Sequence, residues 1–352
     1  MSAVGVVAIR RRYWQCRCGT AGVYAADAVV GIDGRYSRVL QQHACRLSAD
    51  GSFAATQEHL REMLGVSVCA ETIRTLVETH GRVMTRFQPT DAATAAAFQQ
   101  AAGAVEFAVD AGKVNTREEG WKDLKIAVIS KRESGVPATP AGWEEQRLPA
   151  ATMVLAFAAI AAAKTFRRSW RSRLRRLGVT AFGAVHALGD GASWIWKSVD
   201  RALTGCVQTL DVFHACEHLA HASVAIFGEG TAEAGTALTR GRTLLIERGW
   251  AGVCAWVGEL LAVPDADEQD RRRAVTERVL GYFSKHVGRL NYAERLAAGR
   301  AIGSGVVEGQ AKTLGLRLKA RGARWNRANV QSMASLVCVR HSAHWNAYWT
   351  AA

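Results

Sequence analysis

The chain has 352 residues, and its 45 Lys and Arg against 31 Asp and Glu give a formal net charge of +14 at pH 7. This length accommodates two or three domains with their own cores, and so large a positive surplus predicts a phosphate-rich partner. The longest apolar stretch, residues 150–163, is too short to cross a bilayer, and the short apolar N-terminus precedes its arginines instead of following them. No membrane span or signal peptide is therefore expected.

The N-terminal third predicts an irregular segment followed by helices. The eight Cys are irregularly spaced, which predicts reduced thiols and a cytoplasmic location. Residues 1–50 are expected to be irregular, with Cys16-x-Cys18 as a partial zinc-ribbon for a structural Zn²⁺. Residues 51–100 predict a helix-turn-helix-like region, because two stretches of helical apolar spacing, 53–64 and 69–79, flank a Gly-containing break. An ordinary helical hairpin in a core explains the same spacing.

The rest of the chain predicts a mixed α/β core interrupted by helices. Residues 104–110 and 123–130 read as strands, and residues 152–160 read either as a strand or as a buried helix. A helix is expected over 164–177, and two further strands are expected to end at Asp190 and Asp211.

Helical patterns dominate from residue 215 to residue 298. Gly303-Ser304-Gly305 then leads into a helix with Ser304 as its N-cap, and a final helix begins near residue 328. The expected domains are a core of residues 103–218 and 301–352, with an α-helical insertion over 219–300.

Three acids far apart in the sequence stand where a metal-dependent phosphoryl-transfer site needs them. Asp110 and Asp190 end strand-like runs, and Glu308 opens a helix rich in Lys and Arg. Two Mg²⁺ or Mn²⁺ ions require hard oxygen ligands, and converging carboxylates repel one another unless cations lie between them. One Asp after a strand is weak evidence, but the three acids together predict the catalytic and metal-binding residues.

Asp211 also ends a strand-like run and is the alternative to Asp190 as second metal ligand. We favour Asp190, because Gly191 follows it and leaves room for the substrate. Asp211 is then expected to support the acidic cluster or to orient His214.

His214, Glu217 and His218 form the HxxEH pattern of inverted zinc peptidases, which would need a downstream acid such as Glu294. A preceding strand and a strongly basic chain are poor context for that site. Packing and hydrogen bonding beside the active site, by His214 and His218, is the more common role of such a cluster.

Two basic segments are candidates for DNA binding. Residues 309–327 contain six Lys or Arg and no acid, and the candidates there are Lys312, Arg317, Lys319, Arg321 and Arg324, with Trp325 placed to stack on an unpaired base. Residues 164–176 contain seven Lys or Arg, of which Arg168, Arg171 and Arg175 share one helical face. Solvated helix faces, and a core position for Trp325, are the alternatives.

Four motifs, in their order along the chain, resemble those of bacterial insertion-sequence transposases of the ISKra type. They are VDAGK, LGDGASWIW, LDVFHACEHL and IGSGVVEGQAK…RLKARGARW. These enzymes are relatives of the Mutator-like DDE transposases and have an RNase H-like catalytic domain. The resemblance covers about residues 53–345. It implies that Asp110, Asp190 and Glu308 are the catalytic acids, that DNA is cut at element ends and joined to a target, and that a homodimer or larger oligomer acts on DNA in the bacterial nucleoid.

Two features depart from the family. Relatives carry a fuller zinc-ribbon-like Cys pattern near the N-terminus, so the region that chooses the DNA ends is expected to be incomplete here. They also place a basic residue seven positions after the Glu, where this chain has Gly315 and Lys312 is the substitute. A non-catalytic DNA-binding descendant and an RNase H-like nuclease without strand transfer are the alternative functions.

Overall fold

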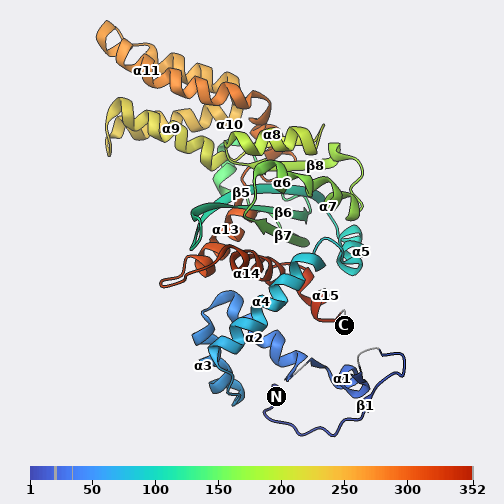
Figure 1. The fold of residues 1–352 in the computed structure, drawn as a ribbon. Coiled ribbons are helices and arrows are strands. Elements are labelled where there is room, and N and C mark those ends of the chain that lie inside the picture. Colours follow the sequence, from blue (N-terminus) through green and yellow to red (C-terminus); the bar gives the residue numbers. More distant parts are fainter. Residues whose placement is uncertain (20–21, 34, 351–352) are drawn as a thin grey trace.

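A five-stranded mixed sheet with helices on both faces forms the centre of the computed structural model (Figure 1). The structure describes residues 1–19, 22–33 and 35–350. The expected α/β class is confirmed. None of the helices in these ranges combines the length and apolar character that a membrane span needs.

The sheet has the order β7-β6-β5-β8-β9. Its strands are β5 (Ala104–Thr116), β6 (Gly120–Arg132), β7 (Met153–Ala159), β8 (Val185–Gly189) and β9 (Val207–Leu210). β5, β6 and β7 pair antiparallel, whereas β8 and β9 extend the sheet parallel to β5. The stretch 152–160, for which apolar periodicity allowed a strand or a helix, therefore contains a strand, β7.

Both faces of the sheet are buried, and the alternation of side chains along β5 shows how. Phe107 and Val109 enter one hydrophobic cluster, and Ala108 enters the other. Successive side chains of a strand point to opposite faces, so a strand buried on both sides is apolar at nearly every position. This two-sided burial explains the continuous apolar runs in the sequence.

The first face is covered by one helix that precedes the sheet in the chain and by three that follow its strands. They are α5 (Ala92–Gln100), α6 (Ala163–Arg168), α7 (Trp170–Arg176) and α8 (Ser193–Ala202). The single helix expected over 164–177 is interrupted at Ser169, which separates α6 from α7. Phe166, Trp170 and Leu174 still form one buried apolar stripe, so the periodicity was correct although the helix is not continuous.

The second face is covered by α13 (Gly305–Leu318) and α14 (Arg327–Arg340), and α15 (His344–Thr350) follows them. The hydrophobic cluster on this face also takes in the N-terminal helices, and α4 (Ala70–Phe87) packs against α14 (Figure 1). At that crossing the backbone of Gly81 approaches the Ser332 carbonyl so closely that a Cβ atom would clash with it.

The N-terminal region is more ordered than the sequence predicted. α2 (Arg38–Asp50) is a helix capped by Ser37, so the expectation of an irregular segment to residue 50 is wrong for these residues. Before it lie α1 (Ala25–Val30) and short two-residue strands, β1 (Tyr13–Trp14), β2 (Val23–Tyr24), β3 (Ile32–Asp33) and β4 (Tyr36–Ser37). The two predicted helices of the helix-turn-helix-like region are present as α3 (Phe53–Leu64) and a longer α4 (Ala70–Phe87).

A helical insertion lies between β9 and α13 and projects from one end of the sheet (Figure 1). Its helices are α9 (Val212–Phe227), α10 (Ala232–Leu261), α11 (Ala266–Phe283) and α12 (Tyr292–Ala297). Helical structure begins at Val212 instead of residue 219, directly after β9. Short 3₁₀ segments are η1 (Pro140–Glu145), η2 (Phe182–Ala184) and η3 (Ser284–Arg289).

Candidate active site and nucleic-acid interface

Three aspartates lie side by side on three neighbouring strands. Asp190 and Asp211 directly follow β8 and β9, but Asp110 lies within β5, which continues to Thr116 instead of ending at residue 110 as predicted. Val109 pairs with Gly189, and Gly189 pairs with Leu210, so Asp110, Asp190 and Asp211 each stand one residue beyond a paired position. The backbone amide of Asp211 donates to the Gly189 carbonyl at 2.8 Å. Parallel strands bring their carboxyl ends to one edge, which is why residues about a hundred positions apart meet here.

Asp190 begins the turn that leads from β8 into α8. Its Oδ1 accepts from the Ala192 amide at 2.8 Å, and its carbonyl accepts from the Trp196 indole at 2.7 Å. Its Oδ2 faces His214 Nε2 at 3.7 Å, and 25% of the Asp190 side chain is exposed. This carboxylate therefore keeps one oxygen toward a partly open site.

Asp211 is instead buried and fully engaged in hydrogen bonds. Its Oδ1 accepts from the His214 amide at 2.9 Å and so caps α9, while its Oδ2 accepts from both the amide and the hydroxyl of Ser304. The relative exposure of Asp211 is 0%. A carboxylate that holds two helix starts together in this way suits a supporting role better than direct ligation of a metal.

Glu308 lies in the first turn of α13, on the face of the sheet that also carries Asp110. Its Oε1 accepts from the Ser304 hydroxyl at 2.8 Å. Ser304 was expected to cap α13, but its side chain makes no capping bond and instead contacts Asp211 and Glu308. The sequence signal for this link was limited to a Ser four residues before the Glu.

The electrostatics show that these side chains share one site. Burial raises the pKa of Asp110, the Ala111 amide partly opposes that rise, and the charges of Asp190 and Asp211 add to it. Burial likewise raises the pKa of Glu308, with further contributions from the nearby charges of Asp211 and Asp110. Converging carboxylates raise one another's pKa in this way because each charge disfavours the next.

His214 supplies a positive charge to the same cluster. The Asp190 carboxylate, 3.7 Å from Nε2, raises the pKa of His214 to about 9, and the charges of Glu217 and Asp211 act in the same direction. His214 Nδ1 also lies 3.2 Å from Glu217 Oε2. The protonated imidazole therefore offsets part of the carboxylate repulsion.

The residues fit a divalent cation only in part. Among residues 1–19, 22–33 and 35–350, no three His, Cys, Asp or Glu side chains are gathered as ligands of one ion. Mg²⁺ commonly takes one or two carboxylates and completes its shell with water and substrate phosphate. Asp110 and Asp190 match that donor set, whereas Glu308 points to Ser304 and would have to turn to join them.

The space over Gly191 is filled, although the sequence suggested that it is open to substrate. A Cβ atom at Gly191 would lie 2.6 Å from Cε2 and 2.7 Å from Cζ of Tyr282, with the hydroxyl oxygen closer still. Residue 191 must therefore be glycine because Tyr282 of α11 packs against it. Asp190 is still the better candidate for second metal ligand, because its carboxylate is partly exposed. The sequence did not indicate Tyr282 as a neighbour of the site, because it lies in an ordinary helical stretch about ninety residues after Gly191.

The HxxEH residues do not gather around one point. His214 turns to Asp190, whereas the His218 ring stacks on Tyr282 with centroids 3.5 Å apart. Within the described ranges, His214, Glu217 and His218 are not part of any group of three side chains that could bind one metal ion. The packing role is the one that the contacts of His218 support.

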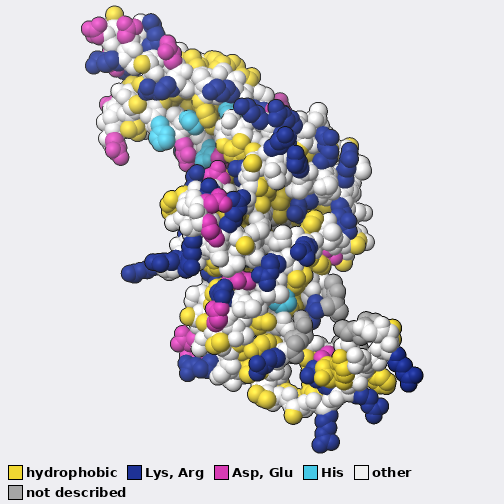
Figure 2. All heavy atoms as spheres, viewed as in Figure 1, with side chains coloured by type: hydrophobic (Ala, Val, Ile, Leu, Met, Phe, Trp, Pro, Cys, Tyr) yellow, Lys and Arg dark blue, Asp and Glu magenta, His cyan; other side chains and the backbone are white. Residues whose placement is uncertain are grey.

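The basic residues of the α13–α14 segment divide into exposed and buried ones. Lys312, Lys319, Arg321 and Arg324 are exposed, and Figure 2 shows basic side chains projecting from this region below the acidic and His side chains beside α9. Arg317 and Trp325 are buried, at 4% and 6% relative exposure.

Arg317 and Trp325 pack together in the core beneath this loop. The Trp325 indole donates to the Leu318 carbonyl at 3.0 Å, and the Arg317 guanidinium lies 4.9 Å from the ring centroids of both Trp325 and Phe53. Burial lowers the pKa of Arg317 to about 10. Stacking of Trp325 on a base is therefore wrong for this arrangement, and the core alternative holds.

A groove of about 520 Å³ lies between the helix-turn-helix-like region and the α13–α14 loop. It brings together segments that are distant in sequence, and its cationic lining includes a residue that sequence reasoning did not single out, Arg117 at the tip of the β5–β6 hairpin. The charged residues that line it are Glu71, Arg74, Glu78, Arg117, Arg317, Arg321 and Arg324.

The second basic segment retains an exposed face. Arg168, Arg171 and Arg175 are exposed on α6 and α7, although Arg171 also donates to the Ala202 carbonyl at 3.1 Å. Basic side chains are visible on that side of the molecule in Figure 2. The face is suitable for phosphate contact but lies apart in sequence from the α13–α14 loop.

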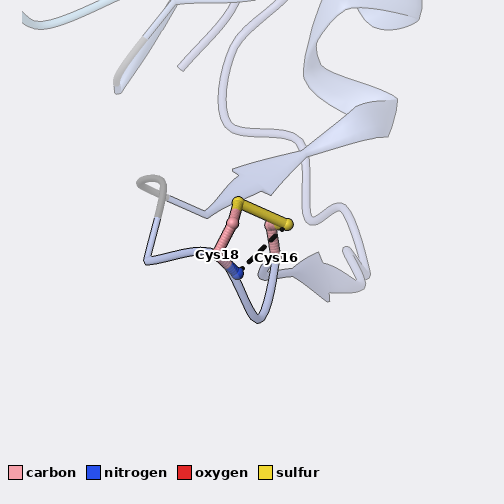
Figure 3. Close-up of a disulfide and its surroundings, with 2 residues drawn as sticks. All are labelled: Cys16 and Cys18. Carbon is pink, nitrogen blue, oxygen red and sulfur yellow. Dashed lines mark hydrogen bonds between the residues drawn. A yellow bond between two sulfur atoms is a disulfide. The ribbon is translucent and has the colours of Figure 1, made fainter.

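Cys16 and Cys18 are joined in a disulfide (Figure 3). The expectation of reduced thiols is therefore wrong for this pair, while the other six Cys are free. A disulfide sulfur is not a thiolate ligand, so Zn²⁺ binding here would require the reduced pair.

No protein-family model matches the chain, and no curated protein matches it.

Proposed function

We propose that the protein is a DDE transposase that cuts DNA at the ends of an insertion sequence and joins the cut ends to target DNA. The observation that carries this proposal is the meeting of four acids: Asp110, Asp190 and Asp211 lie on neighbouring strands, and the Ser304 hydroxyl joins Asp211 to Glu308. Such a cluster costs stability unless cations compensate it, so it is better explained by a reaction than by folding.

The fold supports the same proposal. We infer an RNase H-like core, because an antiparallel group of three strands is extended by two parallel strands, with one acid in the middle of β5 and another after β8. The helical insertion between the second acid and Glu308 agrees with the resemblance to ISKra-type transposases. Fold alone does not define chemistry, so the site residues carry the argument.

Each acid has a distinct proposed role. Asp110 and Asp190 would hold Mg²⁺ or Mn²⁺, which would supply activation of a water or a DNA 3′-hydroxyl and stabilisation of the leaving oxygen. Glu308 would complete the ligand set if its side chain turned away from Ser304, and Asp211 holds the starts of α9 and α13 in place. His214 orients Asp190 and balances its charge.

The positive charge of the chain supports a DNA partner. Arg117, Arg321 and Arg324 line the groove beside the α13–α14 loop, and neutralised backbone phosphates would release counterions on binding. We propose that transposon ends and target DNA are bound there by a homodimer or larger oligomer, since two ends must be joined. The bacterial cytoplasm, at the nucleoid, is the proposed location.

The test uses the DNA that flanks the coding sequence. Inverted repeats in that DNA would be incubated with purified protein and Mg²⁺, and nicks at the repeat ends and joined products would be mapped. Asp110→Asn, Asp190→Asn and Glu308→Gln are each expected to reduce cleavage by at least about a thousandfold while leaving DNA affinity intact, because they remove charge without removing bulk.

Other outcomes separate the alternatives. Binding without any metal-dependent nicking would identify a non-catalytic DNA-binding descendant, and nicks without joined products would identify a nuclease. Robust cleavage by Asp110→Asn or Glu308→Gln would contradict the assignment of the acids. Glu294→Gln, an exposed acid on α12, is the matched control and should cleave normally.

A further inference from the structure

Tyr282 of α11 lies directly against the turn that carries Asp190. The tip of the Tyr282 ring occupies the position that the Cβ atom of any other residue at 191 would take. Only glycine at this position leaves room for the ring. The α11 helix belongs to the helical insertion, whereas Gly191 belongs to the sheet domain. The contact therefore joins the insertion to the residue next to a proposed metal ligand.

The ring of Tyr282 is itself firmly held. It stacks on His218 of α9 at a tilt of 22°, and it makes aromatic contacts with Phe283 and His286 at centroid distances of 5.1 Å. Four aromatic or imidazole rings from α9, α11 and η3 thus form one packed group. A ring held on several sides transmits the position of these helices to whatever it touches.

The Asp190 turn has few other restraints. It follows the end of β8, and its local bonds are those from the Ala192 amide and the Trp196 indole. Gly191, at its centre, loses more conformational freedom than any other residue when it is fixed. From outside the turn, His214 lies near the Asp190 carboxylate, and Tyr282 packs against the Gly191 backbone and limits its freedom.

We propose that Tyr282 is a positioning residue for Asp190, through which the helical insertion fixes the carboxylate in the geometry that binds a divalent cation. The inference rests on the proposed function for the role of Asp190, but the mechanical link between Tyr282 and the turn can be measured without it. Metal and catalytic sites need their ligands held to about 0.5 Å, and supporting residues supply that precision.

The ring, and not the hydroxyl, is the part that acts. The Tyr282 hydroxyl is buried and has no hydrogen-bond partner among the described residues. Tyr282→Phe keeps the stack on His218 and the contact with Gly191, so it should behave as the wild type. Tyr282→Ala removes both contacts and should release the turn.

The direct test is amide hydrogen exchange of the peptide that spans residues 190–196. Tyr282→Ala is expected to raise its exchange rate about tenfold or more, because a restrained turn becomes free to open. Tyr282→Phe should not change that rate. Equal exchange in Tyr282→Ala and the wild type would overturn the proposal, whether or not the protein cleaves DNA.

A second measurement follows Mn²⁺ binding by electron paramagnetic resonance. Tyr282→Ala should weaken Mn²⁺ binding about tenfold, which is the smaller end of the loss in affinity seen when residues that support metal ligands are changed. Tyr282→Phe should bind Mn²⁺ as the wild type does. If the wild type binds no Mn²⁺, the proposed function fails while the exchange result still decides the role of Tyr282. Unchanged Mn²⁺ affinity in Tyr282→Ala would overturn the metal-positioning claim.

Gly191 offers a double-mutant cycle. Gly191→Ala alone should displace the ring and raise exchange in the turn, but the same change in a Tyr282→Ala background should add little, because the clash is gone. Additive effects of the two changes would contradict a direct contact.

Gly241→Ala is the matched control within the insertion, where a Cβ atom would lie 2.9 Å from Trp256 Cε2. It should leave the 190–196 peptide unchanged. The same rise in exchange from this variant would show that general loosening of the insertion is responsible, and would overturn a specific role for Tyr282.

Discussion

The backbone amide and the hydroxyl of Ser304 both donate to one oxygen of Asp211, Oδ2. The other oxygen of Asp211 caps α9 through the His214 amide. One buried carboxylate therefore ties the helix that begins the insertion to the helix that carries Glu308. The Ser304 hydroxyl also lies 2.8 Å from Glu308, and its single proton serves only one acid at a time.

Asp211→Ala should lower the free energy of unfolding by about 3 kcal/mol, because it leaves buried donors at the starts of α9 and α13 without an acceptor. Asp190→Ala, at a partly exposed position, should cost far less stability and instead abolish cleavage. Urea unfolding of both variants, together with the nicking assay, measures the two effects. A stable but inactive Asp211→Ala would make Asp211 the metal ligand.

Trp325→Ala should lower the free energy of unfolding by about 3–5 kcal/mol, since it empties a buried site beside Phe53 and Arg317. DNA affinity of the folded protein should change little. Thermal unfolding and fluorescence anisotropy provide the measurements. Trp121→Ala is the control, because this indole is 63% exposed and should cost little stability. Unchanged stability with weakened DNA binding in Trp325→Ala would restore the base-stacking role.

Arg321→Ala and Arg324→Ala should each weaken DNA binding and reduce the slope of log K against log salt by about 0.9 for every DNA phosphate that the variant no longer neutralises. Both side chains are exposed at the groove beside the α13–α14 loop. Titration of labelled duplex at several salt concentrations measures the slope. Arg240→Ala, whose guanidinium pairs with Glu259, should leave the slope unchanged. Equal slopes in all three variants would place the DNA elsewhere.

Acid should destabilise the protein as the pH falls from about 6.5 to about 4. Burial lowers the pKa of His344 from its ordinary value of 6.5 to about 4, so the unfolded chain takes up the proton first. The neutral ring therefore supports folding fully above pH 6.5, and that contribution, at most about 3 kcal/mol, is lost as the pH approaches 4.

His344→Gln should flatten this pH dependence of the free energy of unfolding, measured by urea unfolding at a series of pH values. Some slope will remain, because burial also lowers the pKa of His186 and of His286 to about 4. His59→Gln, at an exposed position on α3, should leave the slope unchanged. An unaltered slope in His344→Gln would contradict a buried neutral ring.

The sheet was largely predictable because strands buried on both faces leave short apolar runs, as in β5 and β6. Those runs also placed Asp190 and Asp211 correctly after strands, but they ended β5 too early, because it continues past Asp110 to Thr116. Periodicity could not separate strand from buried helix over β7, and it gave no warning of the break at Ser169. The α2 helix was missed although Leu40, Ala44 and Leu47 have helical spacing.

The packing around the acids could not be read from local sequence. The contact between Gly191 and Tyr282 joins residues ninety positions apart, and a glycine that admits a neighbouring ring looks the same as one that admits substrate. Ser304 matched an N-cap pattern, yet its hydroxyl serves Asp211. Trp325 belongs to a basic segment of the sequence, but its ring packs against Phe53, which is distant in sequence, and is buried in the core.

The packing of α4 on α14 has a consequence for how the chain folds. The apolar faces of α2, α3 and α4 find their partners in residues 307–349, more than two hundred positions later. Contacts between such distant segments form slowly, because a long loop must close before they can be made. During synthesis α2, α3 and α4 pack only on one another, and the part of their apolar surface that α14 covers stays exposed until residues 327–340 have emerged. Exposed apolar surface of this kind favours aggregation of the incomplete chain.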